Sequence, residues 1–232
     1  IMSKKILLLG DSIIDNKSYV LDGELDVTAH LKKLYSDQQD VTITNNAVDG
    51  DTMYNIEYNH LDTPEVEEAS HIIVSIGGND LLHNISFLQT TSELSKVMGK
   101  DARIGKWGRR ELNPSRNKVF EETYFEIIKP FTKQYETIVA NLSSHRANLL
   151  LCTVYEGDLA DSDEFSDVNN SSKTMVSLFN DIVYRTANKY GADVLELREI
   201  FVGPEDYANP IEPSHIGGGK LAKAIQKWVS NA

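Results

Sequence analysis

Four short motifs along the chain carry glycines and polar side chains of the kinds that nucleophilic catalysis uses. The first is Gly10-Asp11-Ser12, which directly follows an apolar run. A serine hydroxyl becomes a nucleophile when a base takes its proton, and glycine permits the tight turn that presents such a serine. On its own, however, this tripeptide is more typical of a turn or a helix cap.

The second and third motifs supply groups that can stabilise a negative charge. Gly50 follows another apolar run, and a glycine lets a backbone N–H approach an oxyanion closely because no Cβ intervenes. Gly77-Gly78-Asn79-Asp80 follows a third run, and the neutral amide of Asn79 can donate to a developing negative charge. The structural alternatives are a turn glycine for Gly50 and a helix cap for Asn79 or Asp80.

The fourth motif, Glu212-Pro213-Ser214-His215, places a carboxylate three residues before a histidine. A histidine that takes a proton from serine needs an acceptor to orient its other ring nitrogen, preferably a carboxylate. We interpret the remaining histidines as ordinary structural or surface residues: His30, His60, His71, His83 and His145.

The elements that must position these motifs alternate between strands and helices. Apolar runs predict strands at Ile6 to Leu9, Val41 to Thr44, Ile72 to Ile76, Asn148 to Val154 and Val194 to Leu197. Helical spacing predicts helices over Gly23 to Tyr35, Phe120 to Leu142, Lys173 to Tyr190 and Leu221 to Val229.

Alternating strands and helices predict a three-layer α/β/α fold with a doubly wound, mostly parallel sheet of five strands. In such a sheet, ligands collect beyond the carboxyl ends of the strands. Three of the motifs follow predicted strands and the fourth precedes the last predicted helix. This coincidence supports a shared site more strongly than any single motif does.

We predict a single domain over residues 1–232, because no repeat, low-complexity tract or long linker divides the chain. Between residues 83 and 118 the periodicity is lost and basic residues accumulate, which indicates an inserted excursion. We favour a solvated loop there over a lid or an anion-contacting flap.

Composition excludes several function classes. The formal net charge of -12 argues against nucleic-acid binding. The single cysteine, Cys152, lies in an apolar run and is expected to be a buried hydrophobe. The N-terminal segment lacks a long apolar stretch, so we expect a cytoplasmic protein that does not act at a membrane.

Other catalytic signatures are missing from the sequence. There is no Gly-x-Ser-x-Gly elbow, no His-Glu-x-x-His zinc motif and no Gly-x4-Gly-Lys-Ser/Thr phosphate loop. We therefore predict no metal site and no cofactor. The oligomeric state cannot be inferred, because a helix face used in a dimer resembles one used in the core.

The order of the four motifs resembles the conserved blocks of SGNH/GDSL hydrolases, over about Lys5 to Val229. The resemblance implies a flavodoxin-like fold with strand order 2-1-3-4-5. It makes Ser12 the nucleophile and His215 the general base. The backbone N–H groups of Ser12 and Gly50 and the side chain of Asn79 would form the oxyanion hole, with Asp11 and Asp80 as supporting residues.

The sequence departs from this family pattern in two places. Glu212 stands where the family usually has aspartate, which changes the reach by one methylene; glutamate can still serve as the orienting acid of a triad. The residue after His215 is Ile216 rather than proline, and the following Gly217-Gly218-Gly219 could loosen the loop that holds His215.

The resemblance implies an esterase that hydrolyses acyl esters, short-chain or O-acetyl, through an acyl-enzyme on Ser12. Its partner would be a small-molecule ester. Two alternatives remain: a non-catalytic binding protein on the same fold, whose triad has degraded, and an acyltransferase that uses the same residues. Neither the 83–118 excursion nor the loop from Tyr155 to Asn169 reveals the natural substrate.

Overall fold

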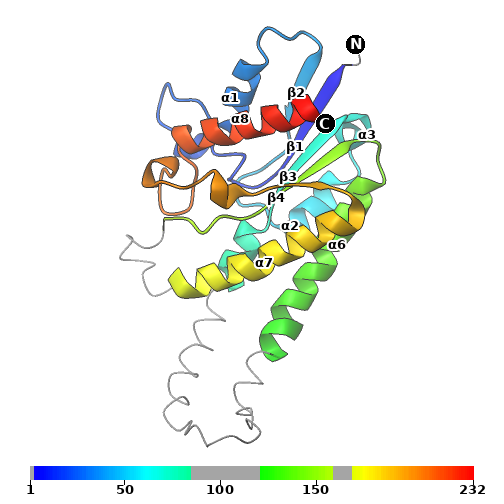
Figure 1. Cartoon of the computed structure of the whole chain (residues 1–232), viewed down its shortest axis with the longest axis vertical. Coiled ribbons are helices and arrows are strands. Elements are labelled where there is room, and N and C mark those ends of the chain that lie inside the picture. Colours follow the sequence, from blue (N-terminus) through cyan, green and yellow to red (C-terminus); the bar gives the residue numbers. More distant parts are fainter. Residues whose placement is uncertain (1–2, 85–120, 159–168) are drawn as a thin grey trace, which may run out of the picture.

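The computed structural model describes residues 3–84, 121–158 and 169–232, without the side chains of 169–171. Figure 1 shows a central sheet with helices on both faces. The strands are β1 (Lys4–Gly10), β2 (Val41–Asn45), β3 (His71–Ser75), β4 (Asn148–Cys152) and β5 (Asp193–Leu195). The helices are α1 (Val27–Leu34), α2 (Met53–Asn55), α3 (Pro64–Glu68), α6 (Lys129–Ser143), α7 (Asn169–Tyr190) and α8 (His215–Asn231), with shorter turns η1 (Lys17–Tyr19), η2 (Ile56–His60), η4 (Tyr124–Ile128), η6 (Leu197–Glu199) and η7 (Pro204–Asp206).

The sheet has five parallel strands in the order β2-β1-β3-β4-β5. This confirms the predicted doubly wound sheet and its strand order. In the register, Leu8 pairs with Asn45 of β2 and with Ile73 of β3, so the carboxyl ends of β1, β2 and β3 lie close together. The loops that carry three of the four motifs leave the sheet at this edge.

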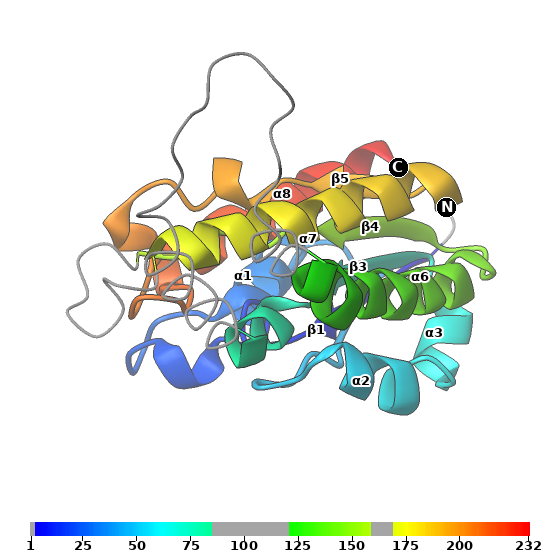
Figure 2. The ribbon, with the colours of Figure 1, turned by 90° about the horizontal axis from the view of Figure 1, so that it is seen from below.

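Alternation along the strands divides the core between the two faces of the sheet. Leu7 and Leu9 pack in the cluster that contains residues of α2, α6 and α7, whereas Ile6 and Leu8 pack against α1 and α8. Figure 2 shows α6 and α7 running side by side in front of the sheet. Because both faces are covered, the strands are apolar on both sides, as the unbroken runs in the sequence predicted.

The predicted strands match the observed strands closely, whereas three helix starts differ, including that of α7, which begins at Asn169 and not at Lys173. The first helix begins at Val27 instead of near Gly23, because the Asp26 side chain accepts the Ala29 N–H and caps the helix there. The last helix begins at His215, six residues before Leu221, because Ser214 caps it by accepting the N–H groups of Ile216 and Gly217. The predicted excursion at 83–118 lies almost wholly outside the described residues.

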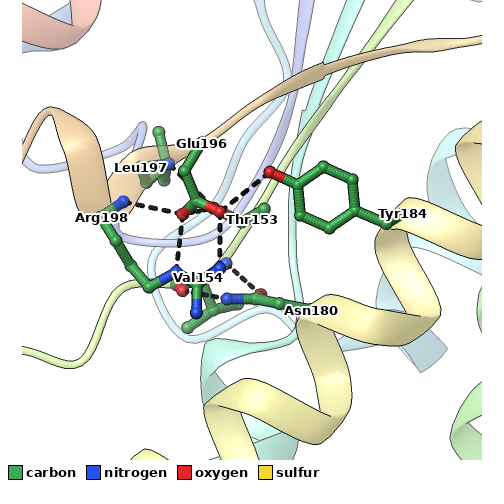
Figure 3. Close-up of polar contacts among 7 residues, drawn as sticks. All are labelled: Thr153, Val154, Asn180, Tyr184, Glu196, Leu197 and Arg198. Carbon is green, nitrogen blue, oxygen red and sulfur yellow. Dashed lines mark hydrogen bonds and ion pairs between the residues drawn. The ribbon is translucent and has the colours of Figure 1, made fainter.

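Beyond β4, side chains hold the chain where the β-ladder ends (Figure 3). Asn180 of α7 accepts the Val154 N–H and donates to the Val154 carbonyl, both at 2.8 Å. The Thr153 hydroxyl donates to Glu196 and accepts the Leu197 N–H. Together these bonds fasten α7 and the chain after β5 to the end of β4.

The Glu196 carboxylate accepts several of the hydrogen bonds in this cluster. Although burial raises its pKa, hydrogen bonds from Arg198, Thr153 and Tyr184 lower it to about 2. The Arg198 guanidinium contributes two of these bonds, at 2.8 and 2.6 Å. Glu196 is therefore ionised at all ordinary pH values and acts as a fixed acceptor.

No helix among the described residues is both long enough and apolar enough to cross a membrane.

Asn180→Ala should lower the free energy of unfolding by about 2–4 kcal/mol, because it leaves a buried N–H and a buried carbonyl of Val154 without partners. Urea denaturation followed by circular dichroism measures the change. The matched control is Asn188→Ala on the exposed face of the same helix, which should change the stability by less than about 0.5 kcal/mol. Equal effects of the two substitutions would contradict this account of Asn180.

Candidate active site

Ser12 lies in a single turn that directly follows β1. Asp11 donates its N–H to the carbonyl of Ser75, and the Asp11 carbonyl accepts the N–H groups of Ile14 and Asp15. A Cβ on Gly10 would lie 2.1 Å from the Ser75 carbonyl oxygen, so this close approach of β1 and β3 requires glycine. Ser12 is presented at the end of the sheet with 6% of its surface exposed.

The Ser12 side chain lies in a pocket of about 70 Å³ at the carboxyl edge of the sheet. Among the described residues, the lining includes polar residues and glycines: Asp11, Ser12, Gly78, Asn79, Glu156, Gly157, Ser172 and Glu212. It also includes apolar and aromatic residues: Ile13, Leu81, Leu82, Val154, Tyr155, Met175, Val176 and Ile211. The arrangement suits a ligand that has one polar reacting centre and a small apolar group.

Two backbone N–H groups of the predicted oxyanion hole are free to donate. In the part of the chain that the structure describes, neither the N–H of Ser12 nor that of Gly50 has an acceptor. Gly50 has a φ of +88°, which favours glycine, and its loop is held beside β1 by the bond from the Val48 N–H to the Gly10 carbonyl. Gly50 is exposed and does not itself line the pocket.

Asn79 lines the pocket, and a hydrogen bond to the loop that carries Gly50 holds its side chain in position. Its Nδ2 donates one hydrogen to the Asp51 carbonyl at 2.9 Å, which leaves the second hydrogen for a ligand. Asp80 does not cap its own segment: its carboxylate accepts the N–H of Met53, the first residue of α2. Burial raises the pKa of Asp80, and the bond from Met53 opposes that rise.

Asp11 is buried beneath the pocket, with 1% of its surface exposed. Its Oδ1 accepts the Ile13 N–H, whereas Oδ2 has no hydrogen-bond partner among the described residues. Burial raises the pKa of Asp11 to about 8, with smaller contributions from the charges of Glu212 and Asp80. Asp11 is therefore mainly protonated at neutral pH.

Cys152 is buried at the end of β4, as expected from its apolar surroundings. Burial raises the pKa of its thiol to about 12, so the sulfur is not a thiolate at neutral pH. The geometry supports a structural role for Cys152.

Glu212 lies directly beside Ser12. The Ser12 hydroxyl is close enough to lower the pKa of the Glu212 carboxyl, although burial outweighs this contact and raises the pKa overall. Within the described residues, no hydrogen bond of good geometry joins the two side chains, and Glu212 Oε2 is buried without a partner. Catalytic hydrogen bonds are often long in the absence of a substrate.

The backbone around Glu212 is tied down at several points. Asn209 Oδ1 accepts the N–H groups of Ile211 and Glu212, and the Ala208 N–H donates to the Glu212 carbonyl. Tyr155 donates its hydroxyl to the Ile211 carbonyl at 2.5 Å. The backbone from which the Glu212 side chain extends is therefore held in place by hydrogen bonds.

The structure does not bring His215 to Ser12, in contrast to the predicted serine–histidine pair. His215 is the first residue of α8, and it does not line the pocket. Its Nδ1 lies 3.1 Å from the Leu25 N and 3.0 Å from Nε2 of His30. The physical reason is the cap at Ser214, which turns the chain into the helix so that Glu212 faces the pocket and His215 faces the start of α1.

The glycine run after His215 also differs from expectation. Gly217 and Gly218 are buried within the first turn of α8, not in a loop. A Cβ on Gly217 would lie 2.2 Å from the Asp206 carbonyl oxygen, so this glycine permits close packing of the helix. The run therefore fixes the start of α8 rather than loosening it.

Sequence reasoning missed two residues that hold the site together, Asn16 and Asn209. Asn16 is fully buried: its Nδ2 donates to the Pro213 carbonyl and its Oδ1 accepts the Val27 N–H. This side chain joins the segment after Ser12 to the Glu212 segment. The only signal in the sequence was the position of each asparagine a few residues from a catalytic motif.

Comparison with known proteins supplies the family. The model of the GDSL-like lipase/acylhydrolase family matches residues 6–217, which is most of the chain. The chain belongs to this family. It is accordingly a serine hydrolase of the SGNH type that acts on ester bonds. No curated protein sequence matches the chain significantly.

Several solved structures share the fold of this GDSL-family chain at low sequence identity. The acetyl xylan esterase AlAXEase is 16% identical, with a TM-score of 0.61 and coverage of 97% of this chain and 98% of that chain. A variant of Axe2, an acetyl xylan esterase from Geobacillus stearothermophilus, is 13% identical, with a TM-score of 0.63 and coverage of 97% and 94%. The psychrotrophic esterase EstA from Pseudoalteromonas sp. is 15% identical, with a TM-score of 0.62 and coverage of 97% and 98%.

Asp11→Asn should change how stability depends on pH. The folded protein keeps the Asp11 proton up to about pH 8, whereas the unfolded chain releases it near pH 4, so this group makes the free energy of unfolding fall as pH rises between those values. Asparagine does not titrate, so this loss is absent from the variant. As the pH rises from about 4 to 8, the free energy of unfolding of Asp11→Asn should therefore increase relative to that of wild type by up to about 1.4 kcal/mol per pH unit.

Urea denaturation of wild type and Asp11→Asn at pH 5, 6.5 and 8 measures this difference. Asp22→Asn, at an exposed aspartate, is the control and should follow wild type at every pH. A constant difference between Asp11→Asn and wild type across this range would show that Asp11 is ionised in the folded protein.

Proposed function

We propose that this protein hydrolyses esters of small acyl groups, O-acetyl esters in particular, through a covalent acyl-enzyme on Ser12. The observation that carries the proposal is the position of Ser12 in a small pocket with a mainly apolar surface, which Asn79 also lines; among the described residues, the Ser12 N–H has no acceptor. The serine supplies the nucleophile, and the donors suit the oxyanion that forms when it attacks a carbonyl.

The oxyanion donors that we propose are the N–H of Ser12, the N–H of Gly50 and the side chain of Asn79. The two N–H groups have no acceptor among the described residues, and Asn79 is already oriented by Asp51. Donors that are fixed before the reaction need no reorganisation when charge develops. In many hydrolases such donors make the largest single contribution to the stabilisation of the transition state.

The size and charge of the pocket support a small, neutral acyl group. A volume of 70 Å³ accommodates roughly five water-sized groups, enough for an acetyl or a short acyl chain. A carboxylate at Glu212, which lines the pocket, disfavours an anionic substrate. The likeness to acetyl xylan esterases agrees with an O-acetyl ester, although at such low identity it speaks for the fold alone.

Ser12→Ala should abolish hydrolysis of p-nitrophenyl acetate and labelling by a fluorophosphonate probe, because both need the serine oxygen. Wild type should prefer p-nitrophenyl acetate to p-nitrophenyl octanoate in kcat/KM. Activity retained in Ser12→Ala would refute the acyl-enzyme, and a wild type that neither turns over nor labels would favour the binding-protein alternative. Release of acyl-alcohol products in the presence of an added alcohol would indicate acyl transfer.

Asn79→Ala should lower kcat by about 100- to 1000-fold with a much smaller change in KM, because the lost donor acts on the transition state. Steady-state kinetics with p-nitrophenyl acetate measure both constants. Asn188→Ala, outside the pocket, serves as the matched control and should be unchanged. Intact turnover in Asn79→Ala would remove this side chain from the proposed oxyanion hole.

A further inference from the structure

Besides Ser12, the lining of the pocket contains two carboxyls close to the nucleophile, Asp11 and Glu212. Asp11 is poorly suited to take a proton from Ser12. Its Oδ1 is occupied by the Ile13 N–H, and its pKa of about 8 leaves it mainly protonated at neutral pH. A group that already carries its proton cannot act as a base.

Glu212 has the geometry of a base. It is the residue whose carboxyl lies beside the Ser12 hydroxyl, its Oε2 is buried without a partner, and only 7% of its surface is exposed. Its backbone N–H is held by Asn209, and the neighbouring Ile211 and Pro213 carbonyls are held by Tyr155 and Asn16. The backbone on both sides of Glu212 is thus held, and its carboxyl lies beside the nucleophile.

His215, in contrast, is engaged elsewhere. Its Nδ1 lies within hydrogen-bond distance of the Leu25 backbone and of His30, and the two imidazole rings are 4.7 Å apart. These contacts place the ring against the start of α1, on the other side of the Ser214 cap. His215 belongs to the packing between α8 and α1.

From this arrangement we propose that Glu212, and not a histidine, is the general base that takes the proton of Ser12. The proposal rests on the proposed function, because it names the base for the same nucleophile. A neutral imidazole can accept a proton on only one of its nitrogens, so a histidine base needs a third group that fixes its tautomer and orientation. A carboxylate needs no such group, because either of its oxygens can accept a proton. Asn209 then acts as a positioning residue for the Glu212 backbone.

The resulting reaction balances with water as the only co-reactant. Ser12 Oγ bonds to the acyl carbon as its proton passes to the Glu212 carboxylate. The bond between the acyl carbon and the alcohol oxygen breaks, and the Glu212 carboxylic acid returns the proton to that oxygen. Water then attacks the acyl carbon and gives a proton to Glu212, which passes it to Ser12 Oγ as the free acid leaves.

The pH profile follows from the groups around Glu212. Burial raises its pKa above that of an ordinary glutamate, the Asp49 charge raises it further, and Ser12 opposes the rise. Asp11, Tyr19 and Tyr155 also interact with it electrostatically. Because Glu212 must be ionised to act as a base, kcat/KM should increase with pH as Glu212 loses its proton. This increase should occur at a higher pH than the pKa of an ordinary glutamate would give.

The test compares Glu212→Gln, His215→Gln and the control Glu199→Gln, an exposed glutamate outside the pocket. The rate of fluorophosphonate labelling and kcat for p-nitrophenyl acetate are measured, with Tm as a check on folding. Glu212→Gln should lose about 100- to 10,000-fold in both rates, while the other two variants stay within about threefold of wild type. His215→Gln should also keep the acid limb of the wild-type pH profile.

Rescue by an external base distinguishes a chemical role for Glu212 from a structural one. Sodium formate should restore part of the activity of Glu212→Ala, whereas sodium chloride at the same ionic strength should not. A folded Glu212→Gln with wild-type rates, or a His215→Gln that loses activity as Ser12→Ala does, would overturn Glu212 as the base and leave the serine esterase intact. Activity that survives Ser12→Ala would instead defeat the proposed function.

Discussion

The contact on which the site depends most is the approach of the end of β1 to β3, where Gly10 faces the Ser75 carbonyl. Any side chain at Gly10 would overlap that oxygen, and the neighbouring Asp11 N–H uses the same carbonyl as its acceptor. This contact fixes where the chain turns after β1 and hence where Ser12 lies. The loops that carry Gly50 and Asn79 are arranged around the same point, through Gly10 and Asp51.

The fold could be predicted from the sequence because its strands are buried on both faces and therefore appear as unbroken apolar runs. Each run from Ile6, Val41, Ile72, Asn148 and Val194 corresponds to a strand, and the observed strand order is the one that the resemblance to SGNH/GDSL hydrolases implied. The same reasoning correctly grouped Ser12 and Asn79, since the carboxyl ends of neighbouring parallel strands meet.

The position of His215 could not be predicted in the same way. Glu212-Pro213-Ser214-His215 contains both an acid and a histidine, and spacing alone does not say which of them faces the serine. The answer depends on the residue at which α8 begins, and that start is set by the Ser214 cap and by glycines that let the helix pack closely. Helix boundaries are the least reliable part of any sequence-based prediction, and here α8 begins six residues before the predicted start at Leu221.

The pair of hydrogen bonds between the Asn180 side chain and the Val154 backbone affects how the pocket could adapt to different acyl groups. The amide mimics the backbone of one further strand residue, so α7 is fastened to the sheet by a peptide-like pair of bonds as well as by packing. Met175 and Val176 on α7 and Val154, just beyond the end of β4, line the same pocket. Helix and strand therefore form one rigid frame, in which the space for the acyl chain varies through the size of these side chains rather than through movement of the backbone.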